Sequence, residues 1–180
     1  MIKDSIRNYL IRKVKPEDYL SLHRIYFETW LATYPNEQFN ITIEDIKFKF
    51  TERLKPEKIL ERQEKITKIG DKEIMILLEY SNDVIGLCNA VERDEYNQLQ
   101  AIYVLPQYHG LGFGYALWQE AKKIFNPQKK TIVHVASYNQ KAINFYEKLG
   151  FKSTGKIFFD EKHKMRNGAM IPELEMIMKE

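Results

Sequence analysis

The stretch of sequence that decides the fold is residues 101–115, which read AIYVLPQYHGLGFGY. Its first third is mostly apolar, β-branched or aromatic, which predicts a strand, and Pro106 ends that strand. Glycines follow at Gly110, Gly112 and Gly114, and a helical spacing of apolar residues begins after them. Closely spaced glycines between a strand and a helix let main-chain N–H groups and the positive end of the helix approach an anion. The sequence therefore predicts a phosphate-binding loop, with a tight strand-to-helix turn as the alternative.

Two common nucleotide-binding motifs fit this chain less well. The pattern G-x-x-x-x-G-K-[ST] is missing, because residues 150–153 lack both the upstream glycine and the Gly-Lys pair. The dinucleotide pattern G-x-G-x-x-G fails as well, because Tyr115 stands in its last place. The loop is therefore not explained by either nucleotide-binding class.

Patterns on both sides of the loop predict an alternation of strands and helices. The predicted strands cover residues 9–14, 73–80, 84–91, 98–105, 131–136, 151–159 and 174–178. The predicted helices cover residues 16–32, 42–53 and 56–68, a segment from the glycine loop to about residue 126, and residues 139–149. This order predicts an α/β fold in which a mixed sheet carries helices on its faces.

Length and composition favour one globular domain over residues 1–180. The chain has 28 Lys and Arg against 25 Asp and Glu, and 44% of its residues are hydrophobic. The charge of +3 is spread along the chain, so we expect no nucleic-acid partner. One cysteine, Cys88, excludes an internal disulfide, and no apolar run approaches the roughly 20 residues that cross a bilayer. Residues 1–10 do not resemble a signal peptide, so we expect a cytoplasmic protein without a membrane partner.

Two blocks of the sequence resemble the GCN5-related N-acetyltransferase (GNAT) family. Residues 107–112, QYHGLG, match the family signature Q/R-x-x-G-x-G/A. Residues 139–151, NQKAINFYEKLGF, match the second hallmark N-x-x-A-x-x-F-Y-x-x-x-G-F at the expected distance downstream. The strict match covers residues 100–155, and the element order resembles the family from about residue 9 to residue 178.

The resemblance implies a central twisted mixed sheet of about seven strands, with helices on both faces, that binds acetyl-CoA as acetyl donor without a metal. The strand ending at Val104 and the parallel strand at residues 131–136 would splay apart, so that the pantetheine arm pairs with exposed main chain. The backbone from Gly110 to Tyr115 would hold the pyrophosphate. The cofactor-binding residues implied in this way are Ile102, Tyr103, Val104, Gly110, Leu111, Gly112, Phe113, Gly114, Tyr115, Asn139 and Tyr146.

The resemblance also assigns a catalytic residue, Tyr146. Transfer of an acetyl group from a thioester to an amine expels a thiolate, and a phenol near the sulfur can protonate that leaving group. The alternative is a core tyrosine, because Ala142, Tyr146 and Leu149 share one face of the predicted helix.

A general base is not assigned by the resemblance. Many family members carry a glutamate on the strand before the glycine loop, whereas residues 97–101 here read NQLQA. A water relay from Glu92, Asp94 or Glu95 is one hypothesis, and a solvated turn is the alternative. His134 is a further candidate, although a histidine within a strand is more often packed and hydrogen-bonded. The remaining histidines have no spacing with Cys88 that indicates a metal site, so we predict none.

The acceptor amine is the least determined feature. The region around residues 29–38 and the helices after it look similar to the polyamine N-acetyltransferases related to PaiA. Four acids, Glu28, Glu37, Glu44 and Asp45, could then meet spermidine or spermine, whereas the alternative places them as solvated acids at helix starts. A protein N-terminus, a peptide lysine and an aminoglycoside are other possible acceptors.

The function predicted from the sequence is therefore an acetyl-CoA-dependent N-acetyltransferase, an acyltransferase acting on a primary amine. The alternative is a non-catalytic acyl-CoA-binding or regulatory module on the same fold, and a nucleic-acid-binding protein is a distant third. A homodimer is possible through residues 174–178, which could exchange or pair between two copies.

Overall fold

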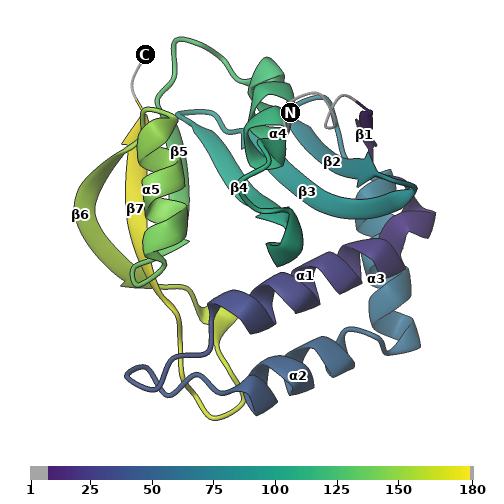
Figure 1. Cartoon of the computed structure of the whole chain (residues 1–180), viewed down its shortest axis with the longest axis vertical. Helices are drawn as coiled ribbons and strands as arrows, with labels where there is room; N and C mark the ends of the chain where they lie inside the picture. Colours follow the sequence, from purple (N-terminus) through teal and green to yellow (C-terminus); the bar gives the residue numbers. More distant parts are fainter. Residues whose placement is uncertain (1–7, 179–180) are drawn as a thin grey trace.

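A computed structural model describes residues 8–178 and shows a seven-stranded mixed sheet with helices on both faces (Figure 1). The strands are β1 (Tyr9–Lys13), β2 (Glu73–Tyr80), β3 (Asp83–Glu92), β4 (Asn97–Val104), β5 (Thr131–Ala136), β6 (Lys152–Phe159) and β7 (Pro172–Met178). The helices are α1 (Tyr19–Thr33), α2 (Ile43–Glu52), α3 (Pro56–Thr67), α4 (Phe113–Ala121) and α5 (Gln140–Lys148). The predicted order of elements and the mixed α/β sheet are confirmed. The single domain over residues 1–180 stays a prediction, and residues 1–7, part of the stretch compared with a signal peptide, lie outside the described range.

The helix ends follow from local chemistry. Thr42 precedes α2 in an extended conformation, and its side chain accepts a hydrogen bond from the main-chain N–H of Asp45. Asn139 does the same for α5, accepting from Ala142 N. Gly150 follows α5 with φ +101°, the left-handed conformation that commonly ends helices and that glycine adopts without strain.

The sheet has the strand order β1-β2-β3-β4-β5-β7-β6, and β4 with β5 is the one parallel pair among the described strands. Asn97–Leu99 of β4 pair with Thr131–Val133 of β5, and no pairing continues from there to the end of either strand. We call the unpaired interval between the two strands the split. The expectation that these two strands splay apart is confirmed.

β7 lies inside the sheet rather than at an edge. It pairs with β5 on one side and with β6 on the other. Residues 174–178 therefore have no free strand edge with which to pair with a second copy in this arrangement, and their exchange between two copies stays a prediction. The edge strands are β1 and β6.

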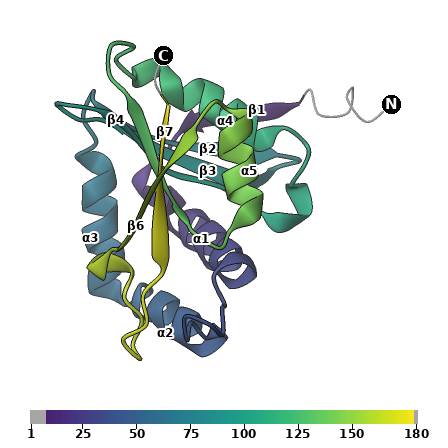
Figure 2. The same ribbon diagram turned by 90° about the vertical axis from the view of Figure 1, so that its left-hand side faces the viewer.

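The two faces of the sheet carry different helices (Figure 2). α4 packs on one face, where a side-chain carbon at Gly86 of β3 would meet Leu117 of α4 at 3.2 Å. α1 packs on the other face, where Tyr26 meets Tyr103 of β4 with ring centroids 5.2 Å apart. We call the side with α4 and α5 the glycine-loop face, and the side with α1, α2 and α3 the α1 face. No helix within residues 8–178 is long and apolar enough to cross a membrane.

Candidate functional site

The split leaves main-chain groups of β4 without a strand partner. Leu105 N donates to Ile85 O at 2.9 Å, so this opposing pair is a hydrogen-bonded one. Because such pairs alternate along an antiparallel ladder, Tyr103 also directs its main-chain N–H and C=O toward β3. Ile102 and Val104 direct theirs toward the split. Of the three predicted edge residues, Ile102 therefore turns both main-chain groups to the split, and Val104 turns its N–H to the split while its carbonyl oxygen is bound by His109. Tyr103 turns its main chain to β3.

His109 joins the end of β4 to the start of α5. Its Nδ1 lies 2.6 Å from Lys141 Nζ, and its Nε2 lies 2.7 Å from Val104 O. An ammonium group can only donate, so Nδ1 accepts from Lys141 and the protonated Nε2 donates to the carbonyl oxygen. Burial lowers the pKa of His109, and the charge on Lys141 lowers it further, although the bond to Val104 opposes this. A neutral imidazole thus positions α5 beside the split, a role that the sequence did not reveal.

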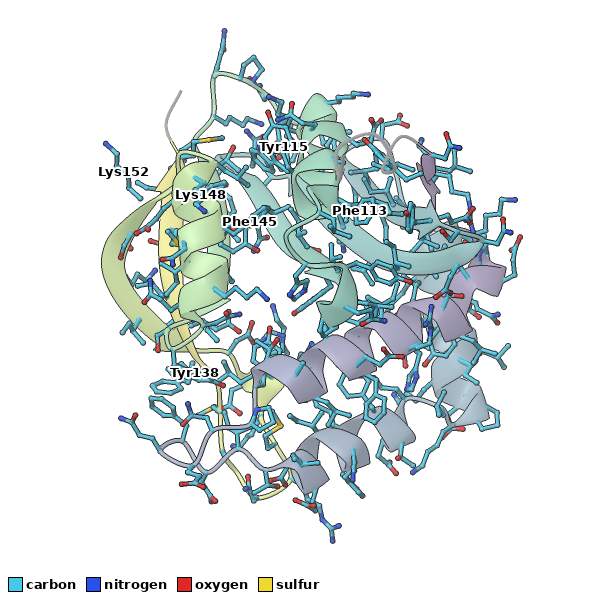
Figure 3. All side chains as sticks on the ribbon, viewed as in Figure 1. Phe113, Tyr115, Tyr138, Phe145, Lys148 and Lys152 are labelled. Atoms are coloured by element: carbon cyan, nitrogen blue, oxygen red, sulfur yellow. The ribbon has the colours of Figure 1, made fainter. Side chains whose placement is uncertain are left out.

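The glycine loop has the geometry of an anion site. Gly110 and Gly112 have φ +81° and +88°, and a side-chain carbon at either position would meet no atom within 4 Å. Gly112 is the N-cap residue of α4 and offers no side-chain acceptor to the first turn, so N–H groups there are free for a ligand. Gly114 is different, because a side-chain carbon there would meet the ring of Phe145 at 3.3 Å. Figure 3 shows Phe145 extending from α5 toward α4.

Tyr146 lies on the inner face of α5 and is 6% exposed. Its ring packs edge-on against Phe151, with centroids 5.8 Å apart. Burial raises the pKa of the phenol well above its ordinary value, and the neighbouring Tyr103 and Cys88 raise it further. Tyr146 therefore stays protonated at neutral pH and is suited to donate a proton rather than to accept one.

Asn139 has a structural role in addition to the predicted cofactor contact. Its Oδ1 accepts from Ala142 N at 3.1 Å and caps α5, which leaves its amide NH₂ group as the part available to a ligand.

A group of tyrosines that the sequence did not single out lies beside β4. The hydroxyl groups of Tyr34 and Tyr103 are 2.9 Å apart, and Tyr138 donates to Tyr34 O at 2.9 Å. Figure 3 shows Tyr138 below α5, near the segment that follows α1. Burial raises the pKa of Tyr34, and the nearby Tyr103, Tyr146 and Glu173 raise it further. Tyr103, Tyr146 and Glu173 are therefore close enough to Tyr34 to influence its titration.

Glu173, at the start of β7, is 7% exposed and forms a hydrogen bond with His163 Nδ1. His134 Nδ1 lies 4.0 Å from the second oxygen of Glu173. The ring of His163 meets Trp30 of α1 edge-on at 5.7 Å, which puts this carboxylate–imidazole pair on the α1 face. Asp160 approaches the pair, but its carboxylate forms an ion pair with Lys162 Nζ at 2.6 Å. Three separate segments contribute these groups, so no local spacing in the sequence indicates them.

The predicted base candidates on the β3–β4 turn lie elsewhere. Glu92 opposes Asn97 at the paired end of β4 and forms an ion pair with Lys129 at 2.6 Å. Asp94 has a fully exposed side chain, and Glu95 is exposed too. The hypothesis of a water relay from this turn is therefore wrong, because the turn lies at the end of β4 remote from the split.

The acids considered for a polycation are only partly available. Asp45 is buried and accepts hydrogen bonds from Thr42 Oγ1 at 2.6 Å and Asn167 Nδ2 at 2.8 Å. Glu28 lies 3.9 Å from Arg24. Glu37 and Glu44 remain exposed.

Comparison with known proteins bears on what this site does. A family model described as the acetyltransferase (GNAT) family matches residues 19–151. No curated protein matches the sequence.

Solved structures resemble the fold over almost the whole chain. The PaiA N-acetyltransferase of Thermoplasma acidophilum, solved in complex with coenzyme A, has a TM-score of 0.70 and 22% identity, covering 96% of this chain and 99% of that one. The ribosomal-protein-S18-alanine N-acetyltransferase of Escherichia coli has a TM-score of 0.61 and 16% identity, with coverage of 95% and 93%. A spermidine N-acetyltransferase chimera of Vibrio cholerae SpeG and hSSAT has a TM-score of 0.57 and 17% identity, with coverage of 95% for both chains. At these identities the similarity establishes the fold.

Proposed function

The chain belongs to the acetyltransferase (GNAT) family, and from that premise we propose that it transfers the acetyl group of acetyl-CoA to a primary amine. The observation that carries the proposal is the split, where the main chain of Ile102 and the N–H of Val104 have no strand partner directly before the glycine loop. An extended pantetheine arm needs such a strand edge, and a pyrophosphate needs such a loop.

The residues present fit coenzyme A. Open space surrounds Gly110 and Gly112, so the backbone can approach a phosphate closely, and the first turn of α4 offers main-chain N–H donors. The PaiA structure, which shares this fold, is described as a complex with coenzyme A. When bound, acetyl-CoA supplies the acetyl group as an activated thioester.

Tyr146 acts as the general acid. Its phenol is buried beside the split and stays protonated because burial raises its pKa, so it can donate a proton to a departing thiolate. The NH₂ group of Asn139 contributes a second donor from the start of α5.

His163 removes the proton from the amine, and Glu173 positions the imidazole of His163. An amine acceptor arrives as an ammonium ion and must lose a proton before it can attack. The hydrogen bond from Nδ1–H to Glu173 leaves Nε2 as the accepting nitrogen, and Nε2 makes no hydrogen bond to any residue within 8–178. Trp30 and the Tyr34–Tyr103 pair connect this imidazole to β4.

Polyamines are one acceptor class for this reaction. The PaiA and spermidine N-acetyltransferase structures share the fold, and Glu37 and Glu44 are exposed acids near α2. A peptide amine is the alternative acceptor. A cytoplasmic location and a homodimer also remain proposals.

The test measures thiol release from acetyl-CoA against a panel of amines, in parallel with calorimetric binding of coenzyme A. Release that depends on an amine supports the proposed function. Binding of coenzyme A without release for any amine would favour a non-catalytic acyl-CoA-binding module. No binding of coenzyme A would refute the assignment of the split and the glycine loop.

A further inference from the structure

A hollow lies on the α1 face, lined by side chains of α1 and α3. It has a volume of about 190 Å³, and Tyr26, Arg53 and Arg62 line it among others. None of the roles described so far uses it. Its position and its charge bear on which amine the proposed acetyltransferase accepts, so the inference rests on the proposed function.

The hollow is next to the acceptor side of β4. Tyr26 lines it and packs against Tyr103, whose hydroxyl group meets that of Tyr34. The charge on Arg53 also affects the pKa of Tyr103, so the guanidinium is near that phenol. One aromatic side chain therefore separates the hollow from the strand that borders the split.

The hollow collects positive charge without compensating acid. Within residues 8–178, neither Arg53 nor Arg62 forms an ion pair or a side-chain hydrogen bond with a carboxylate. The one acid lining the hollow, Glu61, already pairs with Lys58 at 3.0 Å and Lys65 at 2.6 Å. Burial lowers the pKa of Arg53, and the charge on Arg62 lowers it further. Two guanidinium groups that repel each other in a partly buried site favour an anion as their partner.

Two aromatic rings fix the position of Arg53 at the hollow. Its guanidinium carbon lies 4.4 Å from the ring centroid of Phe50 and 5.7 Å from that of Trp30, so both make cation–π contacts. Phe50 and Trp30 are buried and do not line the hollow, so they support the guanidinium from behind.

We infer that the acceptor amine carries an anionic group, a carboxylate or a phosphate, which Arg53 and Arg62 bind in the hollow between α1 and α3. A guanidinium binds the two oxygens of such a group with paired hydrogen bonds, so the anion orients the substrate while its amine approaches β4. A polyamine lacks an anion and would meet the positive charge of Arg53 and Arg62 in this hollow, where the one acid, Glu61, is already paired. An anionic amine is therefore favoured over spermidine.

The experiment compares acceptors that differ in one anionic group. L-lysine is paired with 1,5-diaminopentane, which lacks its carboxylate, and O-phosphoethanolamine is paired with ethanolamine; spermidine is the polycation. Each is titrated by calorimetry without acetyl-CoA and is then tested for thiol release with acetyl-CoA. We expect the anionic member of at least one pair to bind about 10- to 100-fold more tightly, with a correspondingly lower KM. A preference in the L-lysine pair would identify the anion as a carboxylate, and a preference in the O-phosphoethanolamine pair would identify it as a phosphate.

Variants identify the hollow as the origin of the preference. Arg62→Met should raise the Kd and KM of the anionic amine about 10- to 100-fold and leave the neutral partner within about twofold. Arg53→Lys is the second variant, because it keeps a cation at the more buried position. Arg93→Met, at an exposed arginine on the β3–β4 turn, removes a charge far from the hollow and should change neither constant.

The outcomes separate the two proposals. Equal binding of both members of each pair, tighter binding of spermidine, or no effect of Arg62→Met would overturn the anionic acceptor even if amine-dependent thiol release is found. Selective binding and acetylation of an anionic amine, both lost in Arg62→Met, would support the inference. The same selective binding without thiol release would support the anion site but overturn its role for an acceptor, together with the proposed function.

Discussion

The two faces of the sheet are built for ligands in different ways. On the glycine-loop face, ligand-directed groups come mainly from the backbone of one continuous segment, from Ile102 to the first turn of α4. On the α1 face, the candidate groups are side chains from α1, α2, α3 and the segment 160–173, including Arg53, His163 and Glu173. A site made of main chain binds the same ligand with many different side chains around the glycines. In the function proposed above, the side chains of the second face determine which amine is accepted.

The difference explains where specificity lies within one fold. A backbone site tolerates changes of side chain as long as φ values and open space are kept, as at Gly110 and Gly112. A side-chain site changes with single substitutions. If this comparison holds, substitutions on the glycine-loop face should act on coenzyme A or on the chemical step, and substitutions on the α1 face should act on the amine.

The largest expected effect is that of Tyr146→Phe. Removing the general acid should lower kcat about 100-fold or more, while the Kd of coenzyme A stays within about twofold, because the ring still packs against Phe151. Because burial raises the pKa of Tyr146, its proton is retained as the pH rises, so this phenol should cause no loss of wild-type kcat up to about pH 10. Stopped-flow thiol release measured across pH gives kcat of the variant and the pH dependence of kcat of the wild type. Tyr9→Phe, in β1, is the matched control, and equal losses in the two variants would contradict the role of Tyr146.

The next largest effect tests the acid–base pair on the α1 face. His163→Ala should lower kcat about 30- to 100-fold with little change in the KM of the amine, and added imidazole should restore part of the rate. Glu173→Gln should lower kcat less, and the double variant should be no slower than His163→Ala, since Glu173 acts through the imidazole. Tyr146→Phe serves as the control that imidazole does not rescue. If His163→Ala lowers kcat and raises KM by similar factors, and if added imidazole restores no activity, then His163 has only a packing role against Trp30.

The same contrast decides what the sequence could predict. The order of strands and helices and the glycine loop were predictable, because each depends on spacing within a continuous segment. The split at β4 and β5 was expected only from the resemblance to the GNAT family. The pair of His163 and Glu173 and the hollow at Arg53 were not predictable, because their residues lie on different elements whose packing the local pattern does not reveal. Local patterns also misled, since Glu92 to Glu95 are near β4 in sequence but lie at its paired end.

A smaller effect is expected from Gly112→Ala on the glycine-loop face. Gly112 has φ +88°, so alanine costs about 1 kcal/mol of folding free energy in backbone strain, and a methyl group would occupy the space next to the anion site. We expect the Kd of coenzyme A to rise about 10-fold. Gly155→Ala, in β6, is a matched control because its φ is +77° and its surroundings are equally open. Thermal unfolding should show that Gly112→Ala and Gly155→Ala destabilise the fold equally, and calorimetry should show that only Gly112→Ala weakens binding of coenzyme A. Equal losses of binding in both variants would contradict the loop as the pyrophosphate site.

The smallest expected effect concerns Asp45, an acid of the α1 face that could attract a polycation. Its carboxylate is buried and accepts hydrogen bonds from Thr42 and Asn167 near the start of α2, so its charge serves the helix. Asp45→Asn should lower the free energy of unfolding by about 1 kcal/mol, measured by urea denaturation, and leave the KM of the accepted amine within about twofold. Glu44→Gln, at the exposed neighbouring acid, should change neither quantity. A 10-fold rise in KM for spermidine in Asp45→Asn would place a cation-binding site on this face and reverse the charge preference inferred from Arg53 and Arg62.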